Sequence, residues 1–217
     1  MTGLRESQKI ARHNRILTQA ARLFRERGYD AVKMEAIAEA AEVSIGTIYN
    51  YYQNKGDLLV AIVSLEVGEV LAAGETVVGD PPTEPETAIN LLVGGYVEHS
   101  LNYLSKAMWR QAMAIALQQP DSPFGATYAG LDEALAEQTC RLVEALQARD
   151  LAWRDIDAKA VGELIFNNTN MVFTTFVKSQ DMTIDEALAT IRRQLAPVVA
   201  TLAPPVQRRD FGPRATA

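Results

Sequence analysis

The sequence is poor in the side chains that bind metals, form disulfides or attack substrates. Among its 217 residues Cys140 is the single cysteine, so it has no partner for an intramolecular disulfide, and His13 and His99 are the two histidines. Cys-x-x-Cys spacing, a Glu-x-x-His pair, a glycine-rich phosphate loop and a nucleophile-elbow serine are all missing from the sequence. These absences argue against an enzyme, and we expect no catalytic residues, metal site or cofactor.

Long uninterrupted hydrophobic runs are also missing. Glu66 and Glu69 interrupt the most apolar segment, from Leu58 to Leu71, so no run supplies the roughly 20 residues of a membrane span. The opening segment contains four basic residues in place of the apolar stretch of a secretory signal. A soluble cytoplasmic protein is the expectation.

Charge is unevenly distributed along the chain, whose net charge is −6. Residues 1–57 contain nine basic and seven acidic residues, and the segment from Arg5 to Lys33 contains eight basic and three acidic ones. A positive patch on one small module can attract phosphates while the acidic remainder stays away from a duplex. A solvated helix face is the alternative interpretation.

Helical periodicity extends over nearly the whole chain, which predicts an all-α fold. A first amphipathic helix ends at Gly28, and a short second one covers Met34 to Ala41. Glu42 and Val43 form a tight connection, and Ser44 is placed as the N-cap of a third helix that reaches about Tyr52. Two short helices joined by a three-residue turn have the anatomy of a helix-turn-helix. The face of the first helix is formed by Ile10, Leu17, Ala20, Ala21 and Phe24.

The third helix contains hydrogen-bonding side chains where a structural helix needs few. Ile48 is its one clear core residue, and Gly46 costs about 1 kcal/mol relative to alanine in a helix interior. Close approach of the backbone to another molecule explains that cost. In a DNA major groove Thr47 and Asn50 would reach base edges, and phosphates would be contacted by nearby hydroxyls. Tyr52 suits a sideways packing role. The candidate DNA-binding residues are Lys33, Ser44, Ile45, Gly46, Thr47, Tyr49, Asn50, Tyr51 and Lys55.

A capping pair opens the next, long helix. Asn54 is the predicted N-cap, with Asp57 three residues later. A helix N-terminus presents free N–H groups and partial positive charge, so Lys55 beside it is a candidate phosphate contact.

Taken together, these segments resemble the DNA-binding signature of the TetR family. The resemblance extends from about Ile16 to Leu59, a fifth of the chain, and depends on Gly28-Tyr29, residues 37–41, Val43-Ser44, residues 46–52, and Lys55 with Leu58. It implies that Thr47, Tyr49 and Tyr51 occupy contact positions of a recognition helix and that Lys55 touches the DNA backbone. It also implies that the other helices form a ligand-binding and dimerisation domain. Glu42 departs from the family pattern, which has glycine in the turn, and Val32-Lys33 replaces its hydroxyl residues.

Beyond residue 57, periodicity alone predicts the helices. The prediction divides the chain into a DNA-binding domain (1–57), a helical ligand-binding and dimerisation domain (58–203) and a disordered tail (204–217). Helices are expected at 58–78, at 83–104 behind a Thr83-x-x-Glu86 capping box, at 105–118 and at 128–151, with a loop at 119–125.

The last two helices carry the expected dimer interface. The final one, behind a Thr183-x-x-Glu186 capping box, has apolar residues at alternating spacings of four and three, as in a helical bundle. Pro197 is expected to kink it. Its neighbour is apolar on two faces, so one face can meet a partner subunit in a four-helix interface; a monomer that covers both faces is the alternative. The predicted interface residues are Leu164, Ile165, Asn168, Val172, Ile184, Leu188, Ile191, Leu195 and Val198.

A ligand pocket is expected among the central helices, where aromatic, soft or polar side chains interrupt small aliphatic ones. Core packing is the alternative for each candidate, and the asparagines could instead face a partner subunit. The candidates are His99, Tyr103, Trp109, Met113, Phe124, Tyr128, Asn167 and Asn170.

These expectations describe a ligand-responsive transcriptional regulator. We expect a repressor that binds a palindromic double-stranded operator as a homodimer and is released by a small, mainly apolar effector. A helical protein-interaction module without DNA binding is the alternative.

Overall fold

The computed structural model describes residues 2–202, which form α-helices without any β-strand. The predicted tail at 204–217 lies outside the described residues. None of the helices in the described part combines the length and the apolar character that a membrane span needs. The helices are α1 (Thr2–Arg27), α2 (Met34–Ala40), α3 (Ile45–Tyr49), α4 (Lys55–Gly79), α5 (Pro85–His99), α6 (Lys106–Gln118), α7 (Pro123–Ala148), α8 (Ala158–Lys178) and α9 (Ile184–Leu202).

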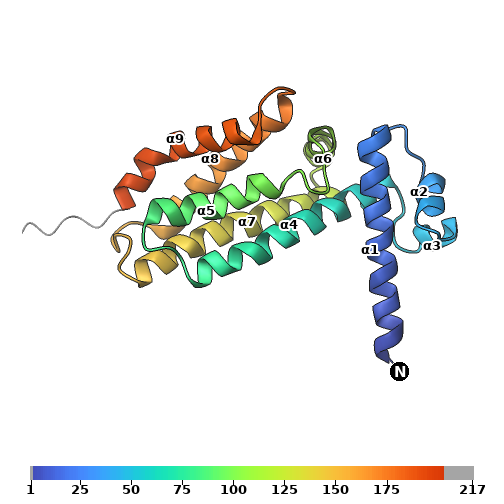
Figure 1. Ribbon diagram of the computed structural model, residues 1–217, viewed down its shortest axis with the longest axis horizontal. Helices are drawn as coiled ribbons and strands as arrows, with labels where there is room; N and C mark the ends of the chain where they lie inside the picture. Colours follow the sequence, from blue (N-terminus) through green and yellow to red (C-terminus); the bar gives the residue numbers. More distant parts are fainter. Residues whose placement is uncertain (1, 203–217) are drawn as a thin grey trace, which may run out of the picture.

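Helices α1 to α3 form a small unit at one end of the molecule (Figure 1). Gly28 ends α1 with a φ of 83°, a conformation that glycine adopts without steric cost. The fully buried Ile37 of α2 and Ile48 of α3 contribute to the core, as does Phe24 of α1. Ile10 does not, because α1 continues past the packed region, and it is 55% exposed.

The predicted caps of this unit are present. The Ser44 side chain accepts a hydrogen bond from the Thr47 N–H at the start of α3, and the Asn54 Oδ1 accepts one from the Asp57 N–H at 3.1 Å. The turn before α3 contains Glu42 at a φ of 52°. A left-handed backbone at a residue with a Cβ costs about 1 kcal/mol, so this turn is formed against local strain.

Helices α4 to α9 make an elongated bundle, and α4 joins it to the N-terminal unit (Figure 1). Helix α4 packs on α5 and α7, α7 packs on α8, and α9 covers α5 and α8. The bundle therefore connects directly to the N-terminal unit through one continuous helix.

Several helix ends differ from the prediction. Helix α5 begins at Pro85 with Glu84 as its N-cap and without a side-chain cap, so the expected Thr83 capping box is wrong. Proline suits the first helical position and moves the helix start past Thr83. It ends at His99 rather than near Leu104. Helix α7 begins at Pro123, capped by Ser122, earlier than the predicted start at Tyr128.

Candidate nucleic-acid interface and ligand cavity

One face of α3 is exposed at the surface of the subunit. Tyr49 is 49% exposed and Ile45 36%, while Gly46 and Asn50 are exposed beside them. Ile48, on the opposite face, is completely buried and holds the helix on the unit. We call the outward set Ile45, Gly46, Tyr49 and Asn50 the α3 face. It lies at the outer end of the molecule, beyond α1 (Figure 1).

Gly46 is not required by the fold. A Cβ built at this position would meet only the Ser44 Oγ, at 3.9 Å, which is ordinary van der Waals contact. The helix would therefore accept alanine, the residue with the higher helix propensity. A function at the exposed surface is the remaining reason for glycine here.

The hydroxyl groups next to the α3 face bond to each other. The Ser44 Oγ lies 2.8 Å from the Thr47 Oγ1 and accepts the Thr47 N–H at 3.1 Å. Ser44 is exposed and Thr47 is half-buried. The pair fixes the first turn of α3, and each hydroxyl retains capacity for a further hydrogen bond because a hydroxyl has one donor and two acceptor sites.

The two tyrosines after α3 pack inward. Tyr52 is buried, as the sequence indicated, and its hydroxyl lies 3.1 Å from the His13 Nδ1 of α1. Tyr51 is half-buried, with its ring edge against His13. The Tyr51 ring thus packs against α1, and its proposed phosphate contact depends on the exposed part of the side chain.

Lys55 contacts its own subunit. Its Nζ donates to the backbone oxygens of Tyr29 at 2.9 Å and Asp30 at 3.0 Å, and it lies 4.8 Å from the centre of the Tyr29 ring. A lysine ammonium has three donors, so one remains for a phosphate. Lys33, the residue before α2, is exposed.

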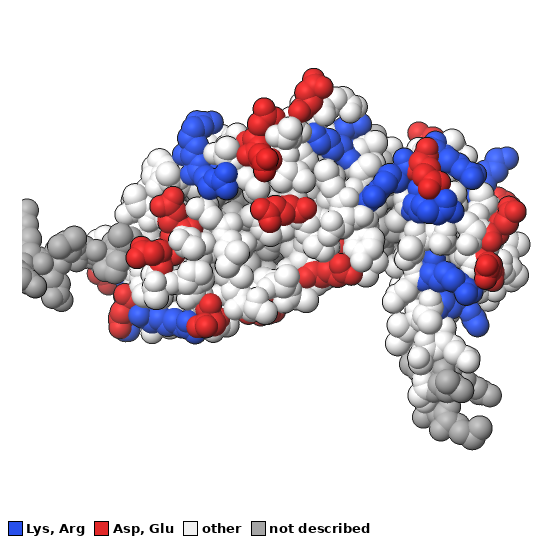
Figure 2. All heavy atoms as spheres, in the orientation of Figure 1, with Lys and Arg blue, Asp and Glu red and all other residues white. Residues whose placement is uncertain are grey.

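Both charge signs appear on the N-terminal unit, at the right of Figure 2, and on the longer bundle, and basic side chains are relatively more frequent on the N-terminal unit. This distribution agrees with the excess of basic residues in the sequence from Arg5 to Lys33.

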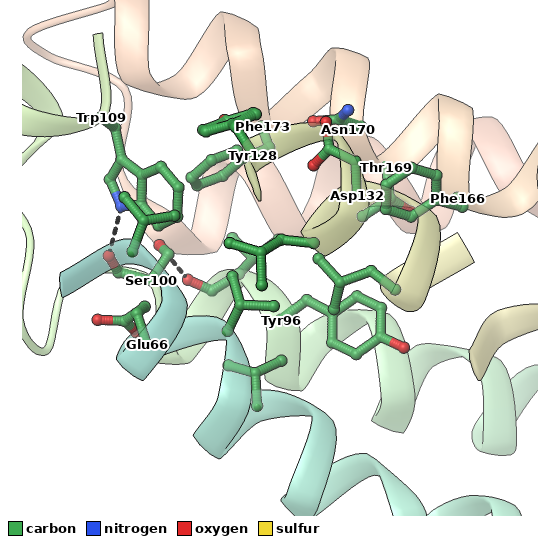
Figure 3. Close-up of a pocket in the computed structure, with 16 residues that line it drawn as sticks. Glu66, Tyr96, Ser100, Trp109, Tyr128, Asp132, Phe166, Thr169, Asn170 and Phe173 are labelled. Carbon is green, nitrogen blue, oxygen red and sulfur yellow. Dashed lines mark hydrogen bonds between the residues drawn. The ribbon is translucent and has the colours of Figure 1, made fainter. Parts of the chain in front are cut away.

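A cavity of about 60 Å³ lies inside the bundle, enclosed by α4, α5, α6, α7 and α8. Its wall is mostly apolar and aromatic and includes Val67, Phe166 and Phe173 (Figure 3). This volume holds a few water molecules. A larger molecule therefore enters only when the surrounding helices move apart.

The cavity includes three of the predicted pocket residues, namely Trp109, Tyr128 and Asn170. The other five lie elsewhere. Met113 and Phe124 pack in or against the core, and Asn167 is exposed on α8. His99 and Tyr103 contact acidic side chains of α4.

Polar residues that the sequence analysis missed also line the cavity, above all Glu66 and Asp132. Asp132 follows Tyr128 by four residues and stands between Leu131 and Leu135, which line the same cavity. An acidic residue within an apolar helical stripe was the available signal. Burial raises the pKa of the Asp132 carboxyl to about 6.

The segment from Ser100 to Ser105 connects the cavity to the N-terminal unit. Glu66 accepts the Tyr103 N–H at 3.0 Å, and Trp109 donates its indole N–H to the Ser100 oxygen at 2.6 Å (Figure 3). From the other side, Arg25 of α1 donates to the backbone oxygens of Leu101 and Asn102. We call these bonds the 100–105 bridge.

The predicted dimer residues do not share one surface. Most of them are buried within the subunit, because α9 packs its apolar seam on its own α5 and α8. Their contact with a partner subunit stays a prediction; the residues buried within the subunit are Ile165, Val172, Leu188, Ile191 and Leu195. Ile184 and Val198 are half-buried.

An apolar stripe on α8 does face outward. Leu164 is 50% exposed and Met171 is 66% exposed, with the exposed Asn167 between them. Nearby, Asn168 donates to the Gln194 Oε1 at 2.8 Å, which joins α8 to α9. Within the described residues its own Oδ1 is buried and lacks a hydrogen-bond partner. We call Leu164, Asn167 and Met171 the α8 stripe.

Comparison with known proteins agrees with this geometry. Residues 16–62 match the model of the bacterial regulatory proteins of the tetR family. The transcriptional repressor KstR of Rhodococcus jostii is 38% identical over 73 residues, which cover 34% of this chain and 34% of that protein. The aligned part thus spans about a third of the relative's length.

Solved structures share the whole fold. A TetR-family transcriptional regulator from Mesorhizobium loti superposes with a TM-score of 0.73 at 18% identity, covering 89% of this chain and 98% of that one. FadR of Thermus thermophilus, a repressor solved in complex with lauroyl-CoA, has a TM-score of 0.62 at 21% identity, covering 86% and 92%.

The chain thus has the fold of these transcriptional regulators, and its N-terminal unit is a helix-turn-helix. The N-terminal unit matches the tetR family of bacterial regulatory proteins, and the matched region, residues 16–62, includes the whole of α2 and α3. The family consists of regulators rather than enzymes.

Proposed function

We propose that the protein represses transcription by binding a palindromic operator as a homodimer, and that a small, mainly apolar molecule in the bundle cavity releases it. The observation that carries this proposal is the α3 face, an exposed polar and aromatic surface on a helix whose other side is anchored by the buried Ile48. A helix presented in this way fits a major groove.

The proposed DNA contacts follow from the exposure of each side chain. Tyr49 and Asn50 offer hydrogen-bonding groups to base edges or phosphates, and Gly46 permits close approach of the backbone. Ser44 and Thr47 contribute through their remaining hydroxyl capacity. Lys33 and the third donor of Lys55 are placed for phosphates.

A homodimer is needed because one recognition helix contacts only a few base pairs. Two copies related by a two-fold axis, with recognition helices about 34–36 Å apart, would contact a palindrome in successive major grooves. The α8 stripe supports this assembly, because two large apolar side chains one above the other on a bundle helix are costly to leave in water.

Release would follow from expansion of the cavity. Helix α4 begins in the DNA-binding unit and contributes Val63, Glu66 and Val67 to the cavity wall, so movement of α4 changes the position of α3. The 100–105 bridge provides a second connection through Arg25. A ligand that favours the expanded shape lowers operator affinity by its differential affinity for the two shapes.

The full-length protein tests this proposal directly. Selection from random duplexes should yield palindromic sequences, and binding to them should weaken with salt by about 0.9 logarithmic units per neutralised phosphate for each tenfold rise. Compounds screened for release should include apolar molecules. The lauroyl-CoA bound to the Thermus thermophilus relative is one starting compound.

The salt experiment also distinguishes the alternative of a protein-interaction module. Such a module would enrich no sequence and would show no salt-dependent affinity for duplex DNA. Either result would overturn the proposed function.

A further inference from the structure

The polar side chains that line the cavity fall into two groups. In the first group each side chain has a partner within the protein. The Tyr96 hydroxyl donates to the Gln138 Oε1 at 2.8 Å, the Ser100 hydroxyl donates to the Val97 oxygen, and the Thr169 hydroxyl donates to the Ile165 oxygen. Glu66 accepts from Tyr103 and contacts the His99 Nδ1. These groups need no ligand.

The second group consists of Tyr128, Asp132 and Asn170. Within residues 2–202 the structure gives no hydrogen bond or ion pair to any of these three side chains, although all of them are half-buried and line the cavity (Figure 3). Tyr128 and Asp132 are one turn apart on α7, and Asn170 is on the adjoining α8. The unpaired polar atoms of these three side chains are accessible rather than sealed in the core, so this cluster is a place where a bound molecule can supply partners.

The cavity wall carries acidic groups without basic ones. Glu66 and Asp132 contribute carboxyls, and the lining residues of the described chain include no lysine, arginine or histidine. The uncompensated charge of Asp132 raises the pKa of the neighbouring Tyr128 hydroxyl, after the larger effect of burial. A bound cation would remove this imbalance.

The remaining wall suits an apolar cation as well. Trp109, Phe166 and Phe173 join the two tyrosines around the cavity, and the faces of aromatic rings attract cations. An aliphatic or aromatic body would pack against the valines of α4.

We propose that the effector is an apolar molecule bearing a protonated amine, with Asp132 as its counter-ion and with Tyr128 and Asn170 as its hydrogen-bond partners. This inference rests on the proposed function and specifies the ligand class of the same cavity. A carboxylate ligand is disfavoured, because its charge would face the unpaired carboxyl of Asp132, and the second carboxyl of the wall, Glu66, already has His99 and the Tyr103 N–H as partners.

The experiment compares three compounds that share one apolar body. We would titrate the full-length protein by calorimetry with 4-phenylbutylamine, 4-phenylbutanol and 4-phenylbutanoate. The amine should bind at least tenfold more tightly than the other two, because a charge-assisted hydrogen bond to a buried carboxylate is lost with either of them. Equal affinity of amine and alcohol, tighter binding of the carboxylate, or no binding of the amine would overturn the inference.

A substitution then assigns the effect to one residue. Asp132→Asn should weaken amine binding by about 10- to 100-fold and change alcohol binding by less than about threefold. Glu133→Gln is the matched control, since Glu133 is the next residue of α7 and is exposed. Equal losses for amine and alcohol in Asp132→Asn would contradict a counter-ion role. The wild-type comparison tests the inference even if this variant fails to fold.

Operator release is measured separately. If the amine binds through Asp132 but leaves operator binding unchanged, the inference stands and the proposed release mechanism fails. If neutral compounds release the operator and the amine does not bind, the proposed function stands and the inference fails.

Discussion

The Asp132 carboxyl lies in a mostly apolar cavity, and its ionisation there should lower the stability of the folded state. Its carboxyl has a folded-state pKa of about 6, raised by burial above the ordinary 3.8. A raised acid pKa means that the folded state binds the proton more tightly than the unfolded state. Wild-type stability should therefore fall as pH rises from about 4 to about 6, by roughly 3 kcal/mol from this residue, and stay reduced above that range.

Asp132→Asn should remove this loss. The variant should melt about 2–4 °C above wild type near neutral pH, because the amide carries no charge into the cavity, although it too remains unpaired. The difference should shrink as the pH falls through 6 and vanish toward about pH 3, below the unfolded-state pKa of 3.8, where Asp132 is protonated in both states. Thermal unfolding at the two pH values, with Glu133→Gln as the control, measures this. A difference that is independent of pH, or a variant less stable near neutral pH, would contradict the assignment.

Single-residue features were predictable from the sequence where a local rule governs them. Ser44 and Asn54 cap their helices, and the Thr183 N–H donates to Glu186 at 2.8 Å in the expected capping box. Asp132 was not selected, because its unpaired state depends on which side chains of α4, α5 and α8 surround it. That information is tertiary rather than local.

Helix α8 carries the surface on which the proposed dimer depends. Leu164→Asp combined with Met171→Asp should weaken self-association at least 100-fold, because charges at an apolar interface lose solvation on assembly. The subunit should remain folded, since both side chains are exposed in the monomer. Sedimentation velocity at several concentrations, with circular dichroism for folding, measures the effect.

Leu117→Asp is the control for that experiment. Leu117 lies on α6, away from the α8 stripe, and is 83% exposed. A double variant of α8 that stays dimeric, or a Leu117 variant that dissociates equally, would contradict the assignment of the interface.

Arg25 joins α1 to the 100–105 bridge. Arg25→Ala should leave operator affinity without effector within about threefold of wild type, while the weakening of operator binding by a releasing effector should shrink about fivefold. The reason is that one of two connections between the cavity and the DNA-binding unit is lost. Operator binding by fluorescence anisotropy, with and without effector, gives both values.

Arg22→Ala is the matched control, because among the residues that the structure describes Arg22 bonds to Gln19 and Glu26 of its own helix. If Arg25→Ala retains the full effector response, the bridge carries no coupling and α4 alone accounts for release.

Periodicity predicted the positions of the helices better than it predicted which elements pack against each helix. The apolar seam of α9 was correctly placed on one helical face, but the same pattern serves a partner subunit or the subunit's own α5 and α8, and the structure shows the latter. Helix starts failed where proline intervened, as at Pro85 and Pro123, because proline at the first helical position overrides a nearby capping pattern.

Across the whole molecule, the proposed function requires that a surface at one end respond to a cavity in the bundle. Helix α4 spans both regions, and the cavity is too small for an effector unless its walls separate. This link could not be predicted from the sequence beyond the existence of a long helix. The proposed function depends on DNA binding by the α3 face.

Gly46→Ala tests that claim most directly, because it separates function from folding at one position. The fold has room for the added methyl group, so thermal stability should be unchanged or raised, by up to about 1 kcal/mol. Gly68→Ala, at an exposed α4 glycine with equally open surroundings, provides the control. We predict that Gly46→Ala lowers operator affinity at least tenfold while Gly68→Ala does not. A folded Gly46→Ala variant with wild-type operator affinity would contradict the account.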